Sequence, residues 1–569
     1  MPRPTARRGA SLLSRSLVQR PLLPAAAWAS SAGCSCRGVS TKAVPLDESS
    51  ASWGNNLRGL GHNNYLGKIL NARVYEVAKE TPLQYAPSLS TELGNAVYLK
   101  REDLQPIFSF KIRGAYNKIA QLSREQLKAG IVACSAGNHA QGVALSASII
   151  GVDAVIVMPT GTPSIKVDAV RKLKGNVRLH GATYDEAAAE AHRLVQQEGR
   201  TLIHPFDDPY VIAGQGTIGM EVLKQMTGKK LDAIFVCCGG GGMLAGIAAY
   251  VKRVRPGVMV IGVEAEDAAG MTASIRAGRL TSLESVGMFA DGAAVKTVGQ
   301  ETFRICNELV DDMVTVSTDE ICAAIKDGFM DTRCVLEPAG ALAIAGVKKW
   351  VGLTNLRDQT FVAIASGANM DFDRLRFVSE RADASETMLS VRIPERPGAF
   401  RALIGHVFPR NVTEFSYRLG DPQNASVYLS FQARGATSEE KRTDAESAMA
   451  AMRADGLLVT DLRDNELAKS HLRHLGGGRA NVDPPERLIR FEFPERPGAL
   501  SHFLASLDTA GAGWNVSLFQ YRNHGADIGR VLAGLQVPLE QLPELQTWLA
   551  RLGYEHHLED GNEVARHFL

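Results

Sequence analysis

From about Tyr65 to about Val378 the chain alternates short apolar runs with helical patterns such as Tyr184–Gln197, and this alternation restricts the fold more than any other feature. A helix between two strands usually joins them in parallel. The pattern therefore predicts an α/β domain built on open parallel sheets. The runs that are predicted to be strands are Val97–Leu99, Gly130–Cys134, Ala154–Met158, Val177–Leu179, Ile234–Cys237, Val258–Val263 and Phe361–Ala365.

Ligands of such sheets bind beyond the carboxyl ends of the strands, so motifs that follow strands are the first candidates for a site. Gly239, Gly240, Gly241 and Gly242 follow one predicted strand and lead through Met243 into a helical segment. Consecutive glycines can turn their backbone N–H groups toward one point, and a phosphate is a natural ligand there. No Lys-Ser/Thr pair follows, so this is not a Walker loop. A merely flexible loop is the alternative, but four glycines lose much entropy on folding.

Ser135, Ala136, Gly137, Asn138 and His139 follow the second predicted strand. Small residues at a helix start let backbone N–H groups approach an anion, and a carboxylate is a suitable one. The side chains of Ser135 and Asn138 can add hydrogen-bond donors. The alternative is a plain strand-to-helix turn that Asn138 caps, so this segment alone does not establish a site.

Ser366 begins a third polar turn, which continues to Asn369 after the last predicted strand. The serine hydroxyl could form a hydrogen bond with a heterocyclic nitrogen. An ordinary turn is the simpler interpretation when this motif is considered by itself.

Lys111 stands between Phe110 and Ile112, so its ammonium group is expected to be poorly solvated. Desolvation lowers the pKa of a lysine, and the neutral amine is the form that attacks an aldehyde. Most lysines beside apolar residues lie at the surface, so the hypothesis depends on the other motifs. Together the motifs offer partners for an aldehyde, a phosphate and a ring nitrogen, and pyridoxal phosphate carries all three.

In combination these motifs resemble the signature set of the threonine dehydratase family, whose members are fold-type II pyridoxal-phosphate enzymes related to the β subunit of tryptophan synthase. The resemblance extends over residues 65–569. It implies that Lys111 forms the Schiff base with the cofactor and carries protons, with Phe110 beside the ring. It also implies that Asn138 contacts the ring hydroxyl, that Gly239–Met243 hold the phosphate, and that Ser366 bonds the pyridine nitrogen.

The resemblance implies an elimination that converts L-threonine to 2-oxobutanoate and ammonia, the first step of isoleucine biosynthesis. Lys111 would remove the Cα proton, and the segment from Ser135 to His139 would bind the substrate carboxylate. A serine at position 366 leaves the pyridine neutral, whereas an aspartate would keep it protonated and make it a stronger electron sink. Loss of the β-hydroxyl is then favoured over transamination.

Two other functions stay open, namely a serine dehydratase or racemase of the same fold and a non-catalytic amino-acid sensor. Serine racemases carry a second serine where this chain has Ala136, which favours dehydration. They also hold a cation near a Glu-x-x-x-Ala-x-Asp pattern, of which Glu264 and Ala268 are present but Gly270 replaces the aspartate, so no metal site is predicted. The complete cofactor set argues against a sensor. Discrimination of serine from threonine depends on the shape of the pocket around the β-methyl group, which contributes only about 1–3 kcal/mol to binding.

A repeat follows the charged segment around Val378–Glu386. The residues Pro394–Phe400 recur as Pro494–Leu500, 100 residues later. Each copy lies between an alternating strand and a helical pattern, which predicts two small α+β modules at 386–470 and 486–569, joined by a polar linker at 471–485. Whether each Pro-Gly turn binds a ligand or only shapes the chain stays open.

The modules resemble the ACT-like regulatory domains of biosynthetic threonine dehydratases, as do the segments Asn515–Phe519 and Tyr521–Gly525. This resemblance implies feedback inhibition by isoleucine, which valine opposes, and assembly into a homotetramer. The catalytic domain would then comprise residues 65–380.

Residues 1–46 are rich in Ser, Ala and basic residues and contain no acidic residue before Asp47. This composition predicts an organelle transit peptide, mitochondrial rather than plastidic, although a plastid stays an alternative. Without the seven basic residues of this segment the net charge falls from +2 to −5, which is ordinary for an enzyme. The basic residues are Arg3, Arg7, Arg8, Arg15, Arg20, Arg37 and Lys42.

Charge and hydropathy exclude several classes of function. A net charge of +2 gives no basic footprint for nucleic acid. No apolar run approaches the roughly 18 residues of a membrane span. The cysteines include no CxxC pair, and the adjacent Cys237 and Cys238 are expected to be small buried residues.

Overall fold

The computed structural model describes residues 64–568, except for 383–385, 395–398, 411, 419–422, 436–437, 472–483, 495–501, 504–505, 508–513 and 523–527. The predicted leader, nearly all of the predicted linker and most of the two repeated turns therefore lie outside the described residues, as does much of the helix expected at Leu500–Leu507. Within the described part, no helix combines the length and the apolar character that a bilayer crossing requires.

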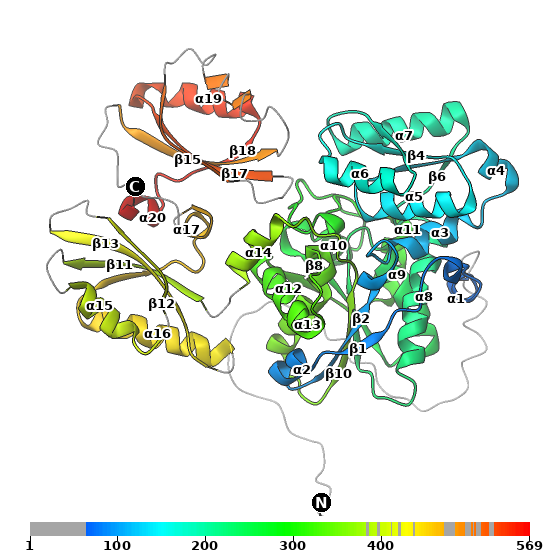
Figure 1. Cartoon of the computed structure of the whole chain (residues 1–569), viewed down its shortest axis with the longest axis horizontal. Coiled ribbons are helices and arrows are strands. Elements are labelled where there is room, and N and C mark those ends of the chain that lie inside the picture. Colours follow the sequence, from blue (N-terminus) through cyan, green and yellow to red (C-terminus); the bar gives the residue numbers. More distant parts are fainter. Residues whose placement is uncertain are drawn as a thin grey trace, which may run out of the picture. The chain divides into compact units, whose positions relative to one another are not determined.

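The larger catalytic sheet has six strands in the order β1-β2-β10-β7-β8-β9. In Figure 1, β2 lies beside β10 although one comes early and the other late in the chain. Every residue of β7 is buried, because helices such as α9 and α13 pack against the sheet and leave no solvated face. The strands are β1 (Leu83–Tyr85), β2 (Ala96–Arg101), β7 (Ala233–Cys237), β8 (Met259–Ala265), β9 (Asp312–Val316) and β10 (Thr360–Ala365), and the two helices are α9 (Gly242–Val254) and α13 (Pro338–Thr354).

A second, four-stranded sheet is parallel throughout and has the order β5-β4-β3-β6. Helix α3 packs against α5, which follows β3, and also against α8, which packs on α9 of the six-stranded sheet. One short helix thus joins the two sheets. The elements are α3 (Lys111–Ile119), β3 (Ile131–Cys134), α5 (Asn138–Ile150), β4 (Ala154–Met158), β5 (Asn176–Leu179), α7 (Tyr184–Glu198), β6 (Thr201–Leu202) and α8 (Pro209–Gln225).

The seven predicted strands and the helix α7 are confirmed, with ends that differ by at most a few residues. Three further strands of these two sheets were not predicted from the sequence. β1 is a half-exposed edge strand that pairs antiparallel with β2, β6 has two residues, and β9 is only partly buried. Short or half-exposed strands lack the continuous apolar run that marks a strand covered on both faces.

The last third of the chain contains two four-stranded antiparallel sheets, ordered β12-β13-β11-β14 and β16-β17-β15-β18. The central strands β11 (Glu386–Pro394) and β15 (Glu486–Pro494) begin 100 residues apart. Both sheets also carry a register shift at the corresponding place, at Val412/Glu414 and at Val516/Leu518. The predicted duplication is therefore present in the strand order of the two sheets and in the place of their register shifts. The other strands are β12 (Val412–Arg418), β13 (Asn424–Gln432), β14 (Leu458–Asp461), β16 (Asn515–Arg522), β17 (Ile528–Gln536) and β18 (Glu555–Leu558).

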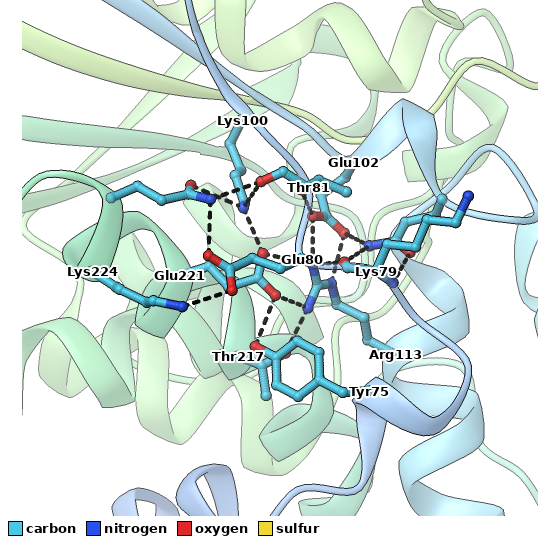
Figure 2. A network of polar contacts seen from close by, with 12 residues as sticks. Tyr75, Lys79, Glu80, Thr81, Lys100, Glu102, Arg113, Thr217, Glu221 and Lys224 are labelled. Carbon is cyan, nitrogen blue, oxygen red and sulfur yellow. Dashed lines mark hydrogen bonds and ion pairs between the residues drawn. The ribbon is translucent and has the colours of Figure 1, made fainter.

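A buried cluster of charges fixes α3 against β2 and α8. Figure 2 shows the fully buried guanidinium of Arg113 between Glu102 and Glu221. Its Nε and Nη1 atoms lie 2.7 Å from Glu102 Oε2 and 2.6 Å from Glu221 Oε1. The second buried cation, Lys100, lies 2.5 Å from Glu221 Oε2 and donates to the carbonyl of Thr81 at 2.6 Å. Two cations thus balance two carboxylates away from water.

In this cluster, burial and the neighbouring opposite charges act against each other on the pKa values of Glu102 and Lys100. Burial alone would raise the pKa of Glu102, but the Arg113 guanidinium and the Lys100 ammonium hold it below its usual value. Burial lowers the pKa of Lys100, and the charge of Glu221 opposes that shift. Since Arg113 lies two residues after Lys111, the cluster also sets the position of the helix start that carries Lys111.

We predict that Arg113→Met lowers the free energy of unfolding by about 3–5 kcal/mol, because it leaves two buried carboxylates without their partner. Urea unfolding followed by circular dichroism measures this change. The control is Arg171→Met, since Arg171 forms only an exposed pair with Asp168 and should contribute about 0–1 kcal/mol. Equal losses in the two variants would contradict the proposed importance of the buried cluster.

Candidate active site

The lysine segment and the Ser366 turn are joined by backbone hydrogen bonds. Phe110 donates its N–H to the carbonyl of Ser366 at 3.1 Å, and Ala368 donates to the carbonyl of Phe108 at 2.9 Å. Between these bonds, residues 109 and 367 form an isolated antiparallel bridge. Lys111 begins α3, with Phe110 as its N-cap. The amine and the hydroxyl that the sequence assigns to one ligand therefore come from adjacent backbones beyond the end of β10.

The side chain of Lys111 is half-buried, and its amine donates to the carbonyl of Pro205 at 3.1 Å. The amine also lies 5.3 Å from the centre of the Phe110 ring. Burial lowers the pKa of Lys111 to about 8, although the nearby groups of Cys237 and Glu337 act in the opposite direction. A neutral, nucleophilic amine is thus accessible near neutral pH.

The tetraglycine segment forms a tightly enclosed turn between β7 and α9. A Cβ on Gly240 would lie 2.2 Å from the ring of Phe206, and one on Gly239 would lie 2.9 Å from the Cα of Ala293. Gly241 has a φ of +93°, which disfavours any other residue. Packing therefore requires glycine here, in addition to any role in binding an anion.

The same turn offers free donors at the start of a helix. Among the residues that the structure describes, no acceptor bonds the backbone N–H groups of Gly240, Gly241 or Gly242. Gly241 is the N-cap and Gly242 the first of the 13 residues of α9, whose N-terminal dipole favours negative charge. Met243 is buried, so only its backbone N–H can contribute. A phosphate group fits these donors.

Ser366 is buried at the end of β10, and its hydroxyl donates to the carbonyl of Ala339 at 3.3 Å. The thiol of Cys237 donates to the same hydroxyl at 3.4 Å. Burial raises the pKa of Cys237 to about 11, so its thiol stays neutral, and the expectation that Cys237 and Cys238 are buried is confirmed. The polar, uncharged surroundings of Ser366 suit a neutral heterocyclic nitrogen.

The segment from Ser135 to His139 divides into polar and buried parts. Gly137 caps α5, and its N–H donates to the Ser135 hydroxyl at 3.3 Å. Ala136 packs against the core of the four-stranded sheet. The His139 ring is buried and donates from Nε2 to the carbonyl of Ile203 at 2.8 Å, and within the described residues its Nδ1 has no hydrogen-bond partner. Burial lowers the pKa of His139 to about 3, which keeps the ring neutral.

Two residues beside Asn138 had no role in the sequence analysis. Asn138 donates from Nδ2 to Glu337 Oε1 at 2.6 Å, and its Oδ1 accepts from Asn369 Nδ2 at 2.7 Å. Burial raises the pKa of Glu337 to about 7, and the neighbouring Asp291 contributes to the shift. One signal could have identified Glu337, namely a single acidic residue within the apolar run 335–347.

Glu264, which belongs to the partial Glu-x-x-x-Ala-x-Asp pattern, accepts hydrogen bonds from the start of a helix. Its carboxylate accepts the N–H groups of Met271 and Thr272, both at 2.8 Å, and the Thr272 hydroxyl at 2.6 Å. Burial raises the pKa of Glu264 to about 7. No group of three or more potential ligands that could hold a metal ion occurs in the described residues.

The geometry fits pyridoxal phosphate. Lys111 supplies an amine with a lowered pKa, the glycine turn supplies free N–H groups in a space that a Cβ would fill, and Ser366 supplies a buried hydroxyl. When bound, the cofactor would place its aldehyde, phosphate and ring nitrogen beside these three features.

Comparisons with known proteins agree with this fit. Residues 74–367 match the family described as pyridoxal-phosphate dependent enzyme. Residues 379–472 and 477–569 each match the C-terminal regulatory domain of threonine dehydratase.

The chain is similar to curated proteins over most of its length. It is 52% identical over 516 residues to the biosynthetic L-threonine dehydratase of Burkholderia multivorans, covering 90% of this chain and 100% of the relative. It is 51% identical over 514 residues to the mitochondrial threonine dehydratase of Schizosaccharomyces pombe, covering 90% and 84%. It is 50% identical over 510 residues to a chloroplastic threonine dehydratase of Solanum lycopersicum, covering 89% and 82%.

Two solved structures match a little over half of this chain. The processed threonine deaminase isoform 2 of Solanum lycopersicum is 51% identical, with a TM-score of 0.55, and covers 56% of this chain and 87% of its own. Maize serine racemase is 31% identical, with a TM-score of 0.52, and covers 55% and 96%.

We predict that Gly240→Ala raises the apparent Kd for pyridoxal phosphate about ten-fold or more. The added Cβ would displace Phe206 or the turn, and overpacking of this kind costs about 1–3 kcal/mol. Titration of cofactor-free protein, followed by absorbance, gives the Kd. Gly257→Ala is the control, because its Cβ would meet no atom within 4 Å. If both variants bind the cofactor as the unmodified protein does, the glycine turn does not hold the phosphate.

We also predict that cofactor-free protein reacts with pyridoxal phosphate faster as pH rises, with an inflection near pH 8. Only the neutral amine attacks, and the lowered pKa of Lys111 makes this form abundant above about pH 8. A lysine with an ordinary pKa would give an inflection at about pH 10.4. Stopped-flow absorbance gives the rate, and Glu337→Gln separates any contribution of Glu337, whose pKa is about 7. An inflection above pH 10 would refute the assignment of Lys111 as the activated amine.

Proposed function

The chain belongs to the threonine dehydratase family of pyridoxal-phosphate-dependent enzymes, and from this membership we propose that it converts L-threonine to 2-oxobutanoate and ammonia. The observation that carries the proposal is the pairing of the Lys111 segment with the Ser366 turn beyond β10. This pairing supports the proposal that the Lys111 amine carries protons and that the Ser366 hydroxyl is the neutral partner of the cofactor ring. In the family this reaction is the first step of isoleucine biosynthesis.

The cofactor, when bound, withdraws electrons from the substrate Cα and so acidifies its proton. Lys111 first holds the cofactor and then, as a free amine, removes that proton. The N–H groups from Gly239 to Met243 would hold the phosphate, and Phe110 would lie beside the ring. The Ser366 hydroxyl cannot protonate the pyridine as a carboxylic acid would. A neutral pyridine ring withdraws electrons only weakly, and this favours loss of the β-hydroxyl over transamination.

The amino-acid substrate is proposed to lie over the start of α5. The backbone N–H groups from Ala136 to His139 and the Ser135 hydroxyl would hold its carboxylate, since an anion is stabilised at a helix N-terminus. Asn138 would contact the ring oxygen of the cofactor. Ala136 brings no hydroxyl to the second face of the substrate, so the site favours dehydration over racemisation. Serine is the alternative substrate, because the β-methyl group contributes only about 1–3 kcal/mol.

We propose residues 65–380 as the catalytic domain, 386–470 and 486–569 as regulatory modules with a linker at 471–485, and 1–46 as a mitochondrial transit peptide. The two matches to a threonine dehydratase regulatory domain support inhibition by isoleucine, opposed by valine. The name of the mitochondrial yeast relative supports the proposed compartment, and the plant relative keeps a plastid as the alternative. We propose a homotetramer, as the family resemblance implies.

We expect the protein without residues 1–46 to release 2-oxobutanoate from L-threonine, with sigmoidal kinetics and suppression by isoleucine. A coupled assay for 2-oxo acids measures this release. Lys111→Ala should reduce turnover by at least about 100-fold and abolish the absorbance of the lysine-bound cofactor.

Three results would change the proposal. Formation of 2-oxo acid by Lys111→Ala would refute the role of this lysine. Turnover that does not respond to isoleucine would keep the dehydratase and refute the proposed regulation. A protein that binds cofactor but does not process threonine would be assayed next with serine.

A further inference from the structure

A chain of hydrogen bonds runs from the protein backbone through two amides to a buried carboxylate. The carbonyl of Ile107 accepts from Asn369 Nδ2 at 2.8 Å, and the same nitrogen donates to Asn138 Oδ1 at 2.7 Å. Asn138 Nδ2 then donates to Glu337 Oε1 at 2.6 Å. These hydrogen bonds therefore link the segment before Lys111, the last predicted turn, the start of α5 and the residue before α13.

The groups at both ends of this series of hydrogen bonds determine the orientation of the Asn138 amide. A backbone carbonyl can only accept, so the nitrogen of Asn369 must face Ile107, and its second N–H then reaches the oxygen of Asn138. At the other end, Glu337 Oε1 accepts from Asn138 Nδ2, so this bond holds the nitrogen of Asn138 on the side of Glu337. This nitrogen carries two hydrogens, and within the described residues only one of them has an acceptor.

Close packing holds the carboxylate in place. Glu337 is 6% exposed, and a Cβ on Gly367 would lie 2.2 Å from its Oε1. A Cβ on Gly292 would lie 3.9 Å from Asn138 Nδ2. The charged groups that act on Glu337 are Asp291, Arg374, Lys166 and Lys111. Glu337 makes no side-chain cap for α13, so its carboxyl is committed to Asn138 rather than to its own helix.

We infer that Glu337 and Asn369 are positioning residues of the cofactor site, which hold the Asn138 amide from both sides so that its remaining N–H points at the ring oxygen of the cofactor. This inference rests on the proposed contact between Asn138 and that oxygen. Neither residue has to touch the cofactor. Their effect passes through Asn138, and this dependence can be measured.

The test is a pair of double-mutant cycles on the apparent Kd for pyridoxal phosphate, obtained by absorbance titration of the full-length protein after removal of its cofactor. We expect Glu337→Ala and Asn369→Ala each to raise the Kd about ten-fold, as loss of a charged or buried hydrogen bond does. In the Asn138→Ala background, either change should alter the Kd less than about two-fold, because nothing is left to position. The long-wavelength band of the lysine-bound cofactor should shift in all three single variants.

Further variants separate positioning from damage to the fold. Glu337→Gln keeps the size and one acceptor, so it should raise the Kd only about three-fold. Asp327→Asn is the control for removing a buried acid elsewhere, since Asp327 pairs with Lys348 on another part of α13, and it should leave both the Kd and the band unchanged.

The possible results are distinct. If Asn138→Ala itself leaves the Kd and the absorption band unchanged, the proposed contact and the positioning inference both fail. If Asn138→Ala weakens binding but Glu337→Ala and Asn369→Ala do not, the contact stands and the positioning inference is overturned. Additive effects in the cycles would also overturn it, because Glu337 and Asn369 would then act independently of Asn138.

Discussion

The buried ion cluster around Arg113 is the interaction on which the site depends. A guanidinium without solvent is tolerated only when carboxylates surround it, so Glu102 and Glu221 must approach Arg113 from different elements. This requirement fixes α3 between β2 and α8. Since α3 also packs on α5, the same short helix aligns the two sheets whose loops meet at Lys111. The reactive amine thus gains its position from charges that never contact a ligand.

Around Lys111, burial keeps several neighbouring side chains uncharged. The groups nearest Lys111 are held neutral by burial, as the pKa of about 11 for Cys237 and of about 3 for His139 indicate. Ser366 adds a hydroxyl rather than a carboxylate. Glu337 also acts on the pKa of Lys111, and it bonds Asn138. Such surroundings suit a neutral cofactor ring whose oxygen and phosphate would be held by N–H groups.

The fold class that the sequence predicts is confirmed, and the site residues proposed from the sequence are those that belong to local motifs. Lys111, the four glycines and Ser366 each follow a strand or begin a helix, so their chemistry could be inferred from their neighbours. The contacts of Glu337 and Asn369 with Asn138 could not be inferred in this way, because Asn138 lies about 200 residues away from both in the chain. The inward turn of His139 depends on Ile203, which the sequence does not place near it. Local patterns predict elements, whereas contacts between distant loops require the tertiary structure.

The pairing of β2 with β10 has a consequence for how the chain folds during synthesis. The strands β3 to β6 lie between residues 131 and 202, so the four-stranded sheet can close as soon as that segment has left the ribosome. The six-stranded sheet has to wait for residues 360–365, because β10 lies between β2 and β7. Contacts so distant in sequence form slowly. Until then β2 has an open edge, and the nascent chain cannot retain cofactor at Lys111. We therefore expect the newly made catalytic domain to be prone to aggregation until β10 has inserted.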